Sequence, residues 1–391
     1  MADERKRGEK QTGLPSGRRR KEGQTLRERF LKTMRFEKPD RLPFFEFGYW
    51  EETLPTWHDQ GLPKHVNTEE RAYEYFGIED MFHVGVEQRH FPPAKAVVLE
   101  ETDEYIITRE DDLSVRQINR EGFRSIPHFL EFPIKTRDDW KWFKERLDPE
   151  APERFPDNFP EIVRQANASG RPVSFPIGSL CGVLRNWMGF ENYAIATIAE
   201  PDFVAEMMES LTRVIVRTAE KAFAAGLKVD VGGGWEDITF NSGPIVHPDF
   251  FYKEAVPRYR RICDVFRRHG VEVIFTDSDG NINRLVDGWL EAGINCMFPL
   301  EVNGGSDPVA LREKYGHRIL LMGGVNKMKL AGDRGTIRKE LKRLLPVVRD
   351  GGFIPHVDHR VPPTVSLVNY QFYLDLKREM FDCGKREPQY R

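Results

Sequence analysis

The chain of 391 residues lacks the hallmarks of several large classes of protein. Its four cysteines are scattered and form no Cys-x-x-Cys pair, which argues against a disulfide scaffold or a cysteine-rich zinc site and fits a reducing compartment. No apolar run is long enough to span a bilayer, and the basic N-terminus has no apolar stretch of the kind that a signal peptide needs. We therefore expect a cytoplasmic protein without a membrane partner.

An excess of charge of one sign is also missing. The formal net charge of −3 gives no general reason to expect nucleic acid or an acidic surface as a partner. Residues 1–24 are polar and basic with almost no apolar side chains, so we predict a disordered tail. A nucleic-acid role for this tail is the alternative, and a solvated tail is the preferred interpretation. We expect one folded domain over residues 25–381 and a short second tail over residues 382–391.

The C-terminal half repeats one unit, in which a helix ends at a glycine and is followed by a short apolar strand and a polar loop. Over the whole chain the candidate strands lie near Pro43, Phe82, Val173, Val229, Val273, Cys296, Leu320 and Phe353. Eight strands are what a closed (β/α)₈ barrel needs, so we predict this α/β fold. Short apolar runs within residues 95–124 predict a small antiparallel β excursion. A doubly wound open sheet is the alternative, but no Gly-x-Gly-x-x-Gly follows a first strand.

Acids, amides and histidines gather directly after the candidate strands. In a barrel, the residues that follow the strands all face one mouth. The residues at these positions are Glu46, Arg185, Glu236, Asp237, Asp277, Asp279, Asn281, Glu301, Asn303, Asn326, Lys327, His356, Asp358, His359 and Arg360. Acids that are gathered at one mouth repel one another, so they need a cation, protons or hydrogen-bond donors to coexist. This concentration of polar residues predicts a functional site.

The paired acids Asp277 and Asp279 allow two functional interpretations. In the first, both acids and a histidine from residues 356–359 bind a divalent metal, since residues two apart share a face of an extended stretch. In the second, no metal is present, one acid is held protonated as a general acid, and Arg185 or Arg360 binds a substrate carboxylate. The plainer alternative is a turn at Asp279 that leads into the next helix.

Seven short stretches, taken in their order and spacing, resemble the uroporphyrinogen decarboxylase superfamily. They are Trp235-Glu-Asp237, Gly243-Pro244, His247-Pro248, Asp279-Gly280-Asn281, Gly323-Gly324-Val325, Gly351-Gly352 and Val361-Pro362-Pro363. The resemblance runs from about Thr25 to Phe381. It implies a (β/α)₈ barrel and one of two chemistries. One branch decarboxylates the acetate side chains of uroporphyrinogen without a cofactor, and the other transfers methyl groups between a corrinoid protein and a thiol.

The sequence departs from the motifs of both branches. Glu46-Phe-Gly-Tyr-Trp50 stands in place of the arginine-rich loop of the decarboxylases. Asp277-Ser-Asp-Gly-Asn281 replaces the His-x-Cys-Gly-Asn zinc motif of the methyltransferases, and His359, three residues before Pro362, replaces their later cysteine. The resemblance therefore implies that Asp277, Asp279 and His359 hold a divalent metal with harder ligands than thiolates.

We predict an enzyme of this superfamily that performs metal-assisted group transfer, first of all methyl transfer, at the C-terminal mouth of the barrel. The predicted catalytic residues are Glu236, Asp237, Glu301 and His356. The predicted substrate-binding residues are Glu46, Arg185, Asn281, Asn326 and Arg360. We expect a small-molecule substrate and a corrinoid, carried by a corrinoid protein, as methyl donor or acceptor. The alternatives are cofactor-free decarboxylation of uroporphyrinogen or another carboxylate, and a non-catalytic barrel that binds a corrinoid.

Overall fold

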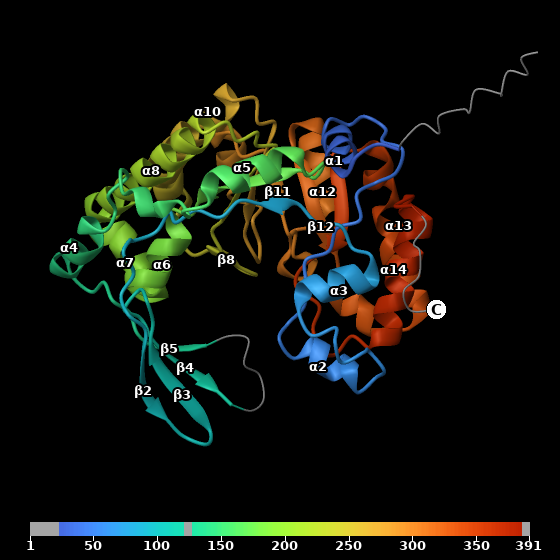
Figure 1. Ribbon diagram of the computed structural model, residues 1–391, viewed down its shortest axis with the longest axis horizontal. Coiled ribbons are helices and arrows are strands. Elements are labelled where there is room, and N and C mark those ends of the chain that lie inside the picture. The colour runs from blue at the N-terminus through green and yellow to red at the C-terminus, as the bar shows by residue number, and fades with distance from the viewer. Residues whose placement is uncertain (1–22, 121–126, 385–391) are drawn as a thin grey trace, which may run out of the picture.

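The computed structural model describes residues 23–120 and 127–384 (Figure 1). Most of the two predicted tails, residues 1–24 and 382–391, lies outside these residues. A parallel sheet with surrounding helices forms the body of the molecule, and a separate antiparallel sheet projects from it. Within the described ranges, the helices include none with the length and apolarity that a membrane crossing requires.

Seven parallel strands form the central sheet, and they lie side by side in chain order. The strands are β1 (Phe82–His83), β6 (Val173–Gly178), β7 (Val231–Trp235), β10 (Val273–Asp277), β11 (Cys296–Phe298), β12 (Leu320–Val325) and β13 (Phe353–Val357). Each strand pairs with its successor, so every connection returns to the same end of the sheet, and the sheet curls into a half-barrel. The predicted α/β barrel-type fold is confirmed, and all carboxyl ends of the strands point to one mouth.

The strand expected near Pro43 differs from the prediction, because residues 42–48 form no regular strand. This extended segment has few ladder bonds: the Glu79 N–H donates to the Phe44 carbonyl at 2.8 Å, and Tyr49 forms a single parallel bridge with Val361. Proline has no N–H to donate to a ladder, which disfavours a regular strand here. The prediction of a regular first strand is therefore wrong, although the segment lies between β13 and β1.

Helices follow the strands and pack on the outside of the half-barrel (Figure 1). These helices include α5 (Phe159–Ala168), α8 (Pro201–Ala224), α10 (Val256–Arg268), α11 (Val286–Ala292), α12 (Pro308–Tyr315), α13 (Arg334–Asp350) and α14 (Leu367–Phe381). The others are α1 (Leu26–Met34), α2 (Thr53–His58), α3 (Glu69–Phe76), α4 (Arg137–Glu145), α6 (Cys181–Met188), α7 (Phe190–Ala199) and α9 (Pro248–Phe250). Single turns of 3₁₀ or π helix span Pro152–Arg154, Phe251–Ala255, Val302–Gly304, Gly316–Arg318 and Lys327–Ala331.

The long helix α8 forms where the sequence predicts an amphipathic helix. Pro201 occupies the first turn of the helix. The backbone N–H groups of a first turn have no acceptor within the helix, so proline, which lacks an N–H, costs no hydrogen bond there. Phe203, Met207, Leu211 and Ile215 recur at helical spacing, and all four are buried. Burial of this face holds α8 against the sheet and α10.

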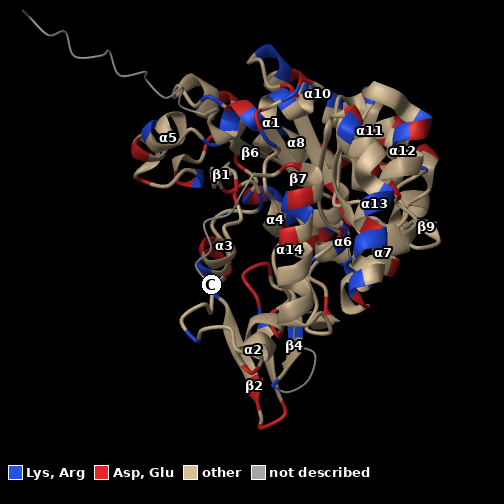
Figure 2. Ribbon diagram, turned by 90° about the vertical axis from the view of Figure 1, so that its right-hand side faces the viewer, with Lys and Arg blue, Asp and Glu red and all other residues tan. Residues whose placement is uncertain are grey.

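The antiparallel excursion is confirmed and is longer than predicted. Its strands are β2 (Val97–Glu101), β3 (Tyr105–Arg109), β4 (Val115–Asn119) and β5 (His128–Glu131), paired in that order. The sheet extends away from the half-barrel (Figure 1). Acidic residues lie at the turn between its first two strands, whereas the outer helices carry charges of both signs (Figure 2).

The interior of the half-barrel changes from apolar to polar along the strands. Near the amino ends of the strands the interior is an apolar layer to which α1 contributes two side chains, and it consists of Phe30, Met34, Phe45, Met81, Val231, Val273, Cys296, Leu320, Met322 and Ile354. Toward the carboxyl ends, inward positions two residues apart carry Gly233 and Trp235 on β7, and Phe275 and Asp277 on β10. A Cβ at Gly233 would lie 2.7 Å from the Phe275 ring, so glycine leaves room for that ring. The apolar core thus gives way to a cavity that opens at the mouth.

Candidate active site

Three aspartates meet at the mouth of the half-barrel. Asp277 ends β10, Asp279 lies in the loop that follows, and Asp237 lies just beyond the neighbouring strand β7. Each offers a carboxylate oxygen, and these three oxygens lie within 4.8 Å of one another. Asp237 has a φ of +45°, in the left-handed region that non-glycine residues rarely adopt. The structure thus brings the predicted pair together and adds Asp237 to it.

His359 lies at the edge of this aspartate cluster. Its Nε2 is 3.2 Å from Asp279 Oδ2, and its ring stacks on Trp50 at 5.3 Å and meets Phe47 edge-on at 5.7 Å. His359 Nδ1 and Asp279 Oδ1 are buried and have no hydrogen-bond partner among the described residues. The arrangement therefore leaves both a nitrogen and an oxygen available to a ligand.

Electrostatics make the aspartate cluster unfavourable in the absence of a cation or proton. Burial raises the pKa of Asp277 well above its usual value, and the charges of Asp237 and Asp279 raise it further. Burial and the Asp279 carboxylate also raise the pKa of Asp237, while Arg185 and His359 act in the opposite direction. Like charges this close cannot all ionise without compensation. The cluster is consequently built to hold either a proton or a cation.

Glu236, predicted to be catalytic, points away from the aspartates although it is next to Asp237. Its buried carboxylate accepts hydrogen bonds from the Ser179 hydroxyl, the Tyr259 hydroxyl and the N–H groups of residues 180–182. Burial raises its pKa. Because these N–H groups open helix α6, Glu236 caps that helix and fixes the position of the Asp237 loop. The geometry favours a positioning role, and its catalytic role stays a prediction.

Glu301 connects two loops beside the aspartates. Its Oε2 accepts a hydrogen bond from the Gly280 N–H at 3.0 Å, and its Oε1 accepts one from Lys327 Nζ at 3.0 Å. Since Gly280 directly follows Asp279, this contact holds the loop that carries Asp279. A general acid or base would need one of these oxygens to exchange partners, so the predicted catalytic role of Glu301 also stays a prediction.

Asp358 and Asn326 form hydrogen bonds with the loops that follow β11 and β12, next to Glu301. Asp358 accepts hydrogen bonds from the N–H groups of Val302 and Lys327, and burial raises its pKa to about 6. Asn326, predicted to bind substrate, donates to Asn303 Oδ1 at 2.9 Å. These contacts lie outside the lining of the cavity, so the geometry gives Asn326 a structural contact.

The other predicted substrate-binding residues are already engaged in the protein. Arg185 donates to the backbone carbonyl of Asp237. Asn281 accepts a hydrogen bond from the Asn283 N–H at 3.2 Å, which closes a local turn. Arg360 donates to Glu69 Oε2 at 2.7 Å and lines the cavity. Of these three residues, Arg360 is the one that lines the cavity and so lies nearest to a substrate-binding position.

Glu46 lines the cavity and forms a buried ion pair with Lys377. Its Oε1 lies 2.6 Å from Lys377 Nζ and 2.8 Å from the Tyr373 hydroxyl, and both charged side chains are 0% exposed. The Val357 N–H of β13 donates to Glu46 Oε2 at 3.3 Å. Glu46 thus ties the extended segment 42–48 to the last strand and helix, and its carboxylate is satisfied within the protein.

His356 lies on β13 and is one of the residues that line the cavity described below. Its Nδ1–H donates to the Val357 carbonyl at 2.8 Å, so the tautomer places the acceptor lone pair on Nε2. Burial, and to a smaller extent Lys377, lowers its pKa to about 3. At neutral pH the side chain is therefore an uncharged hydrogen-bond acceptor.

Lowering the pH is expected to destabilise the protein through His356. Its folded pKa of about 3 lies below the ordinary value of 6.5, so between these values only the unfolded state gains the proton and stability falls as pH falls. The loss should approach about 1.4 kcal/mol per pH unit from this residue. Urea unfolding of wild type and His356→Gln at about pH 7 and about pH 5 isolates the effect. A difference between the two proteins that does not change with pH would contradict it.

A cavity of about 700 Å³ opens between the aspartate cluster and the segment that follows α3. Its aromatic lining consists of Phe45, Phe47, Tyr73, Trp235, Phe275 and Phe298. Its ionisable lining consists of Glu46, Glu69, Glu70, Asp80, His83, Asp277, His356 and Arg360. Asp277 belongs to both the aspartate cluster and the cavity, so the two form one site. The wall from residues 69–86 was not anticipated, since that stretch has one two-residue strand and no motif.

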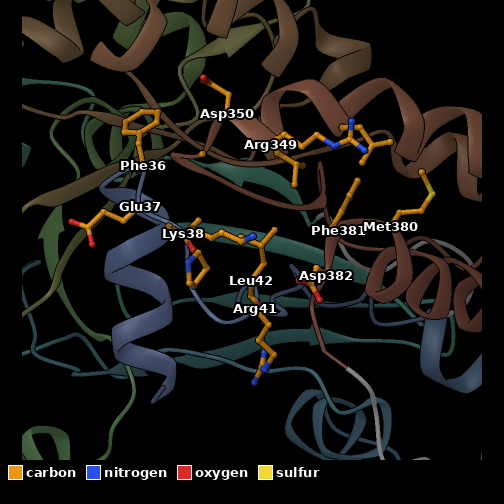
Figure 3. A pocket seen from close by; sticks show the side chains of 15 residues that line it. Phe36, Glu37, Lys38, Arg41, Leu42, Arg349, Asp350, Met380, Phe381 and Asp382 are labelled. Atoms are coloured by element: carbon orange, nitrogen blue, oxygen red, sulfur yellow. The ribbon is translucent and has the colours of Figure 1, made fainter. Parts of the chain in front are cut away.

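A second cavity of about 380 Å³ lies at the other end of the half-barrel (Figure 3). Phe36, Lys38 and Arg41 line one side of it, and the residues that end α13 and α14 line the other. Because α13 leads into the start of β13, this cavity is at the amino ends of the strands. None of the predicted site residues lines it. Chemistry in barrel enzymes belongs to the carboxyl ends, so the larger cavity is the candidate active site.

Comparisons with known proteins agree with this architecture. A parallel half-barrel with a polar site at the carboxyl ends of its strands is a TIM-barrel-like architecture, and TIM-barrel enzymes have their active sites at these ends. The model of the uroporphyrinogen decarboxylase (URO-D) family matches residues 136–380, more than half of the chain. The chain therefore belongs to the uroporphyrinogen decarboxylase family, which contains decarboxylases and methyltransferases.

Solved structures share the fold at low sequence identity. A methyltransferase from Methanosarcina mazei is 15% identical with a TM-score of 0.59, and the match covers 92% of this chain and 99% of that one. A B12-independent methionine synthase from Shewanella sp. W3-18-1 is 11% identical with a TM-score of 0.41 over 88% of this chain and 97% of that one, too weak to carry an argument. Comparison with curated proteins gives no match.

Proposed function

We propose that the protein binds a divalent metal ion at Asp237, Asp277, Asp279 and His359 and catalyses group transfer, first of all methyl transfer, on a small molecule in the adjoining cavity. The observation that carries the proposal is the set of three carboxylate oxygens within 4.8 Å of one another, with His359 3.2 Å from Asp279. Membership of a family that includes methyltransferases supports the reaction class.

The residues at the mouth fit a divalent cation by three criteria. Their donor set, carboxylates with one imidazole, suits metals such as manganese, iron or zinc. Asp279 Oδ1 and His359 Nδ1 are buried without partners among the described residues, as ligand atoms would be in a metal-free chain. A cation would also remove the repulsion that raises the pKa of Asp277 through burial and its neighbours. When bound, it would supply Lewis-acid polarisation of a substrate atom.

The chain itself would do the positioning. Glu301 holds the loop of Asp279 through the Gly280 N–H, and Glu236 holds the start of α6 beside Asp237. With a substrate bound, the aromatic lining would keep water from the inner part of the cavity, and electrostatic interactions there would be stronger. His356 offers a neutral acceptor nitrogen to the substrate. These are the roles in which we expect the predicted site residues to act.

The second candidate is cofactor-free decarboxylation of a small carboxylate. The observation that favours it is the pKa of Asp277, which burial and the neighbouring carboxylates raise, as a proton donor requires. Uroporphyrinogen itself fits poorly, because its several carboxylates would meet a wall whose one described guanidinium, Arg360, is paired with Glu69. The third possibility is a non-catalytic barrel that binds a corrinoid or a corrinoid protein, whereas in the methyl transfer proposed first the corrinoid protein is the methyl donor or acceptor.

Metal titration tests the proposal directly. Full-length protein is treated with chelator, freed of it, and titrated with Mn²⁺, Co²⁺ and Zn²⁺ while thermal unfolding is followed. Binding to the native state alone stabilises it by about 2.7 kcal/mol at a hundredfold excess over Kd. We expect such stabilisation with at least one of the three ions, and about one ion per chain by elemental analysis. If none of the ions binds or stabilises the chain, the metal-dependent mechanism is wrong.

A further inference from the structure

We infer that the cavity binds a small methylated ammonium ion as the methyl donor of the group transfer proposed above, on which this inference rests. In that transfer one N–CH₃ bond would break with its electron pair left on nitrogen, which departs as a neutral amine, and the methyl group would form its new bond to a nucleophilic acceptor, the corrinoid of the proposed function. Two independent properties of the cavity lead to this class of molecule: the sign of the charge on its wall, and the aromatic rings that surround Asp277.

Carboxylates outnumber cations in the cavity wall. The lining has five carboxylates and a single guanidinium, that of Arg360. Arg360 is bound to Glu69 at 2.7 Å, and Lys377 behind the wall neutralises Glu46. The His356 imidazole adds no charge, because its Nδ1–H donates to the backbone and burial keeps its pKa low. Among the described lining residues an anionic substrate finds no unpaired cation, whereas a cationic substrate is attracted.

Aromatic rings flank the inner carboxylate on both sides. In the sheet, Asp277 is in register with Trp235 on β7 and with Phe298 on β11. Adjacent strands lie about 4.8 Å apart, so two aromatic side chains and one carboxylate occupy the same level of the half-barrel. Phe298 in turn meets Phe47 edge-on at 4.5 Å and Phe275 at 5.4 Å between ring centroids. Phe47, Phe275 and Phe298 thus form a connected group of rings on one side of the acid, and Trp235 is in register with it on the other side.

This combination of groups distinguishes a methylated ammonium from other cations. Its positive charge is attracted by the excess of carboxylates in the cavity wall, Glu70 and Asp80 among them, and by the negative faces of the rings. Its methyl groups pack against the rings and leave water without loss of N–H hydrogen bonds, whereas a primary ammonium would have to give up three. The residues in register with Asp277 on both neighbouring strands are aromatic, which suits a ligand that donates no hydrogen bonds.

Calorimetric titration of the full chain, with and without bound metal, tests the inference. The probes are choline, the alcohol in which a tert-butyl group replaces its trimethylammonium group, and propionate. We expect choline to bind about tenfold more tightly than its neutral isostere, and propionate to bind more weakly than either. Equal affinity for choline and the isostere, tighter binding of propionate, or no binding of choline would each overturn the inference.

Two leucine variants identify the binding wall. Phe298→Leu and Phe47→Leu keep apolar bulk but remove the ring face, so each should weaken choline by about tenfold and leave the isostere nearly unchanged. Phe190→Leu is the matched control, because Phe190 is outside the cavity lining and 42% exposed. Thermal unfolding identifies any variant that fails to fold. Wild-type affinity for choline in both cavity variants would overturn the inference.

The two proposals fail separately. Choline binding without uptake of any divalent ion would support the ammonium site and refute the metal mechanism. Metal uptake with no choline binding at any metal loading would refute the ammonium site and leave the metal mechanism intact. Asp277 is shared by both, so the cavity variants Phe298→Leu and Phe47→Leu, rather than an Asp277 variant, decide the substrate class.

Discussion

Asp277→Asn is expected to weaken divalent-metal binding by at least about 100-fold. Asp277 is the member of the aspartate cluster that carries a ligand oxygen at the end of a rigid strand, between Asp237 and Asp279. The amide keeps the shape of the side chain but removes its charge, so a loss of affinity reports on the charge rather than on packing. Titration of the chelator-treated variant with the ion that stabilises wild type measures the loss.

The same substitution should stabilise the metal-free protein. Burial and two neighbouring carboxylates raise the pKa of Asp277, so its ionised form opposes folding at neutral pH and its removal should gain on the order of 1 kcal/mol. Asp59→Asn is the matched control, since the Asp59 side chain is 86% exposed and should change neither property. An Asp277→Asn protein that is less stable without metal, or that binds metal as wild type does, would contradict the assignment.

The aspartate pair could be predicted because its signal is local. An apolar run that ends in Asp277-Ser-Asp279 places two acids at a strand end, and β10 ends at Asp277. The different orientations of Glu236 and Asp237 do not follow from strand alternation, because both residues lie beyond the end of β7 and Asp237 has a left-handed φ of +45°. The fold places Asp237 with Asp277 and Asp279, whereas Glu236 faces α6.

Other parts of the site depend on contacts that no local pattern contains. Glu46 was predicted to bind substrate because it follows an apolar run, but its partner Lys377 lies 331 residues away. Likewise, Arg360 resembles a free anion-binding residue until the fold places Glu69 beside it. Residues 42–48 gave a strand-like pattern, yet the extended segment is held by side chains rather than by a ladder. Hydrophobic patterning predicts burial, and it leaves the partners of buried charges undetermined.

Lys377→Met is expected to lower the free energy of unfolding by about 3–5 kcal/mol. Lys377 and Glu46 are both 0% exposed and lie 2.6 Å apart, so loss of the cation leaves a buried carboxylate without its charge partner. The remaining Tyr373 hydroxyl and Val357 N–H cannot compensate a full charge. Urea unfolding of wild type and variant measures the loss.

The double variant Glu46→Gln with Lys377→Met separates an unpaired charge from lost packing. Removing both charges should restore much of the stability, because the penalty of the single variant comes mainly from the isolated carboxylate. Lys64→Met is the control: Lys64 and Asp59 form an exposed pair at 3.7 Å, and its loss should change stability by less than about 0.5 kcal/mol. If Lys377→Met lowers the free energy of unfolding no more than Lys64→Met does, or if the double variant is no more stable than the single variant, the ion pair does not anchor segment 42–48 to β13.

Segment 42–48 carries Phe47 into the cavity, where its ring meets His359. The single variant should therefore also weaken the binding of metal and choline, and the double variant should restore both.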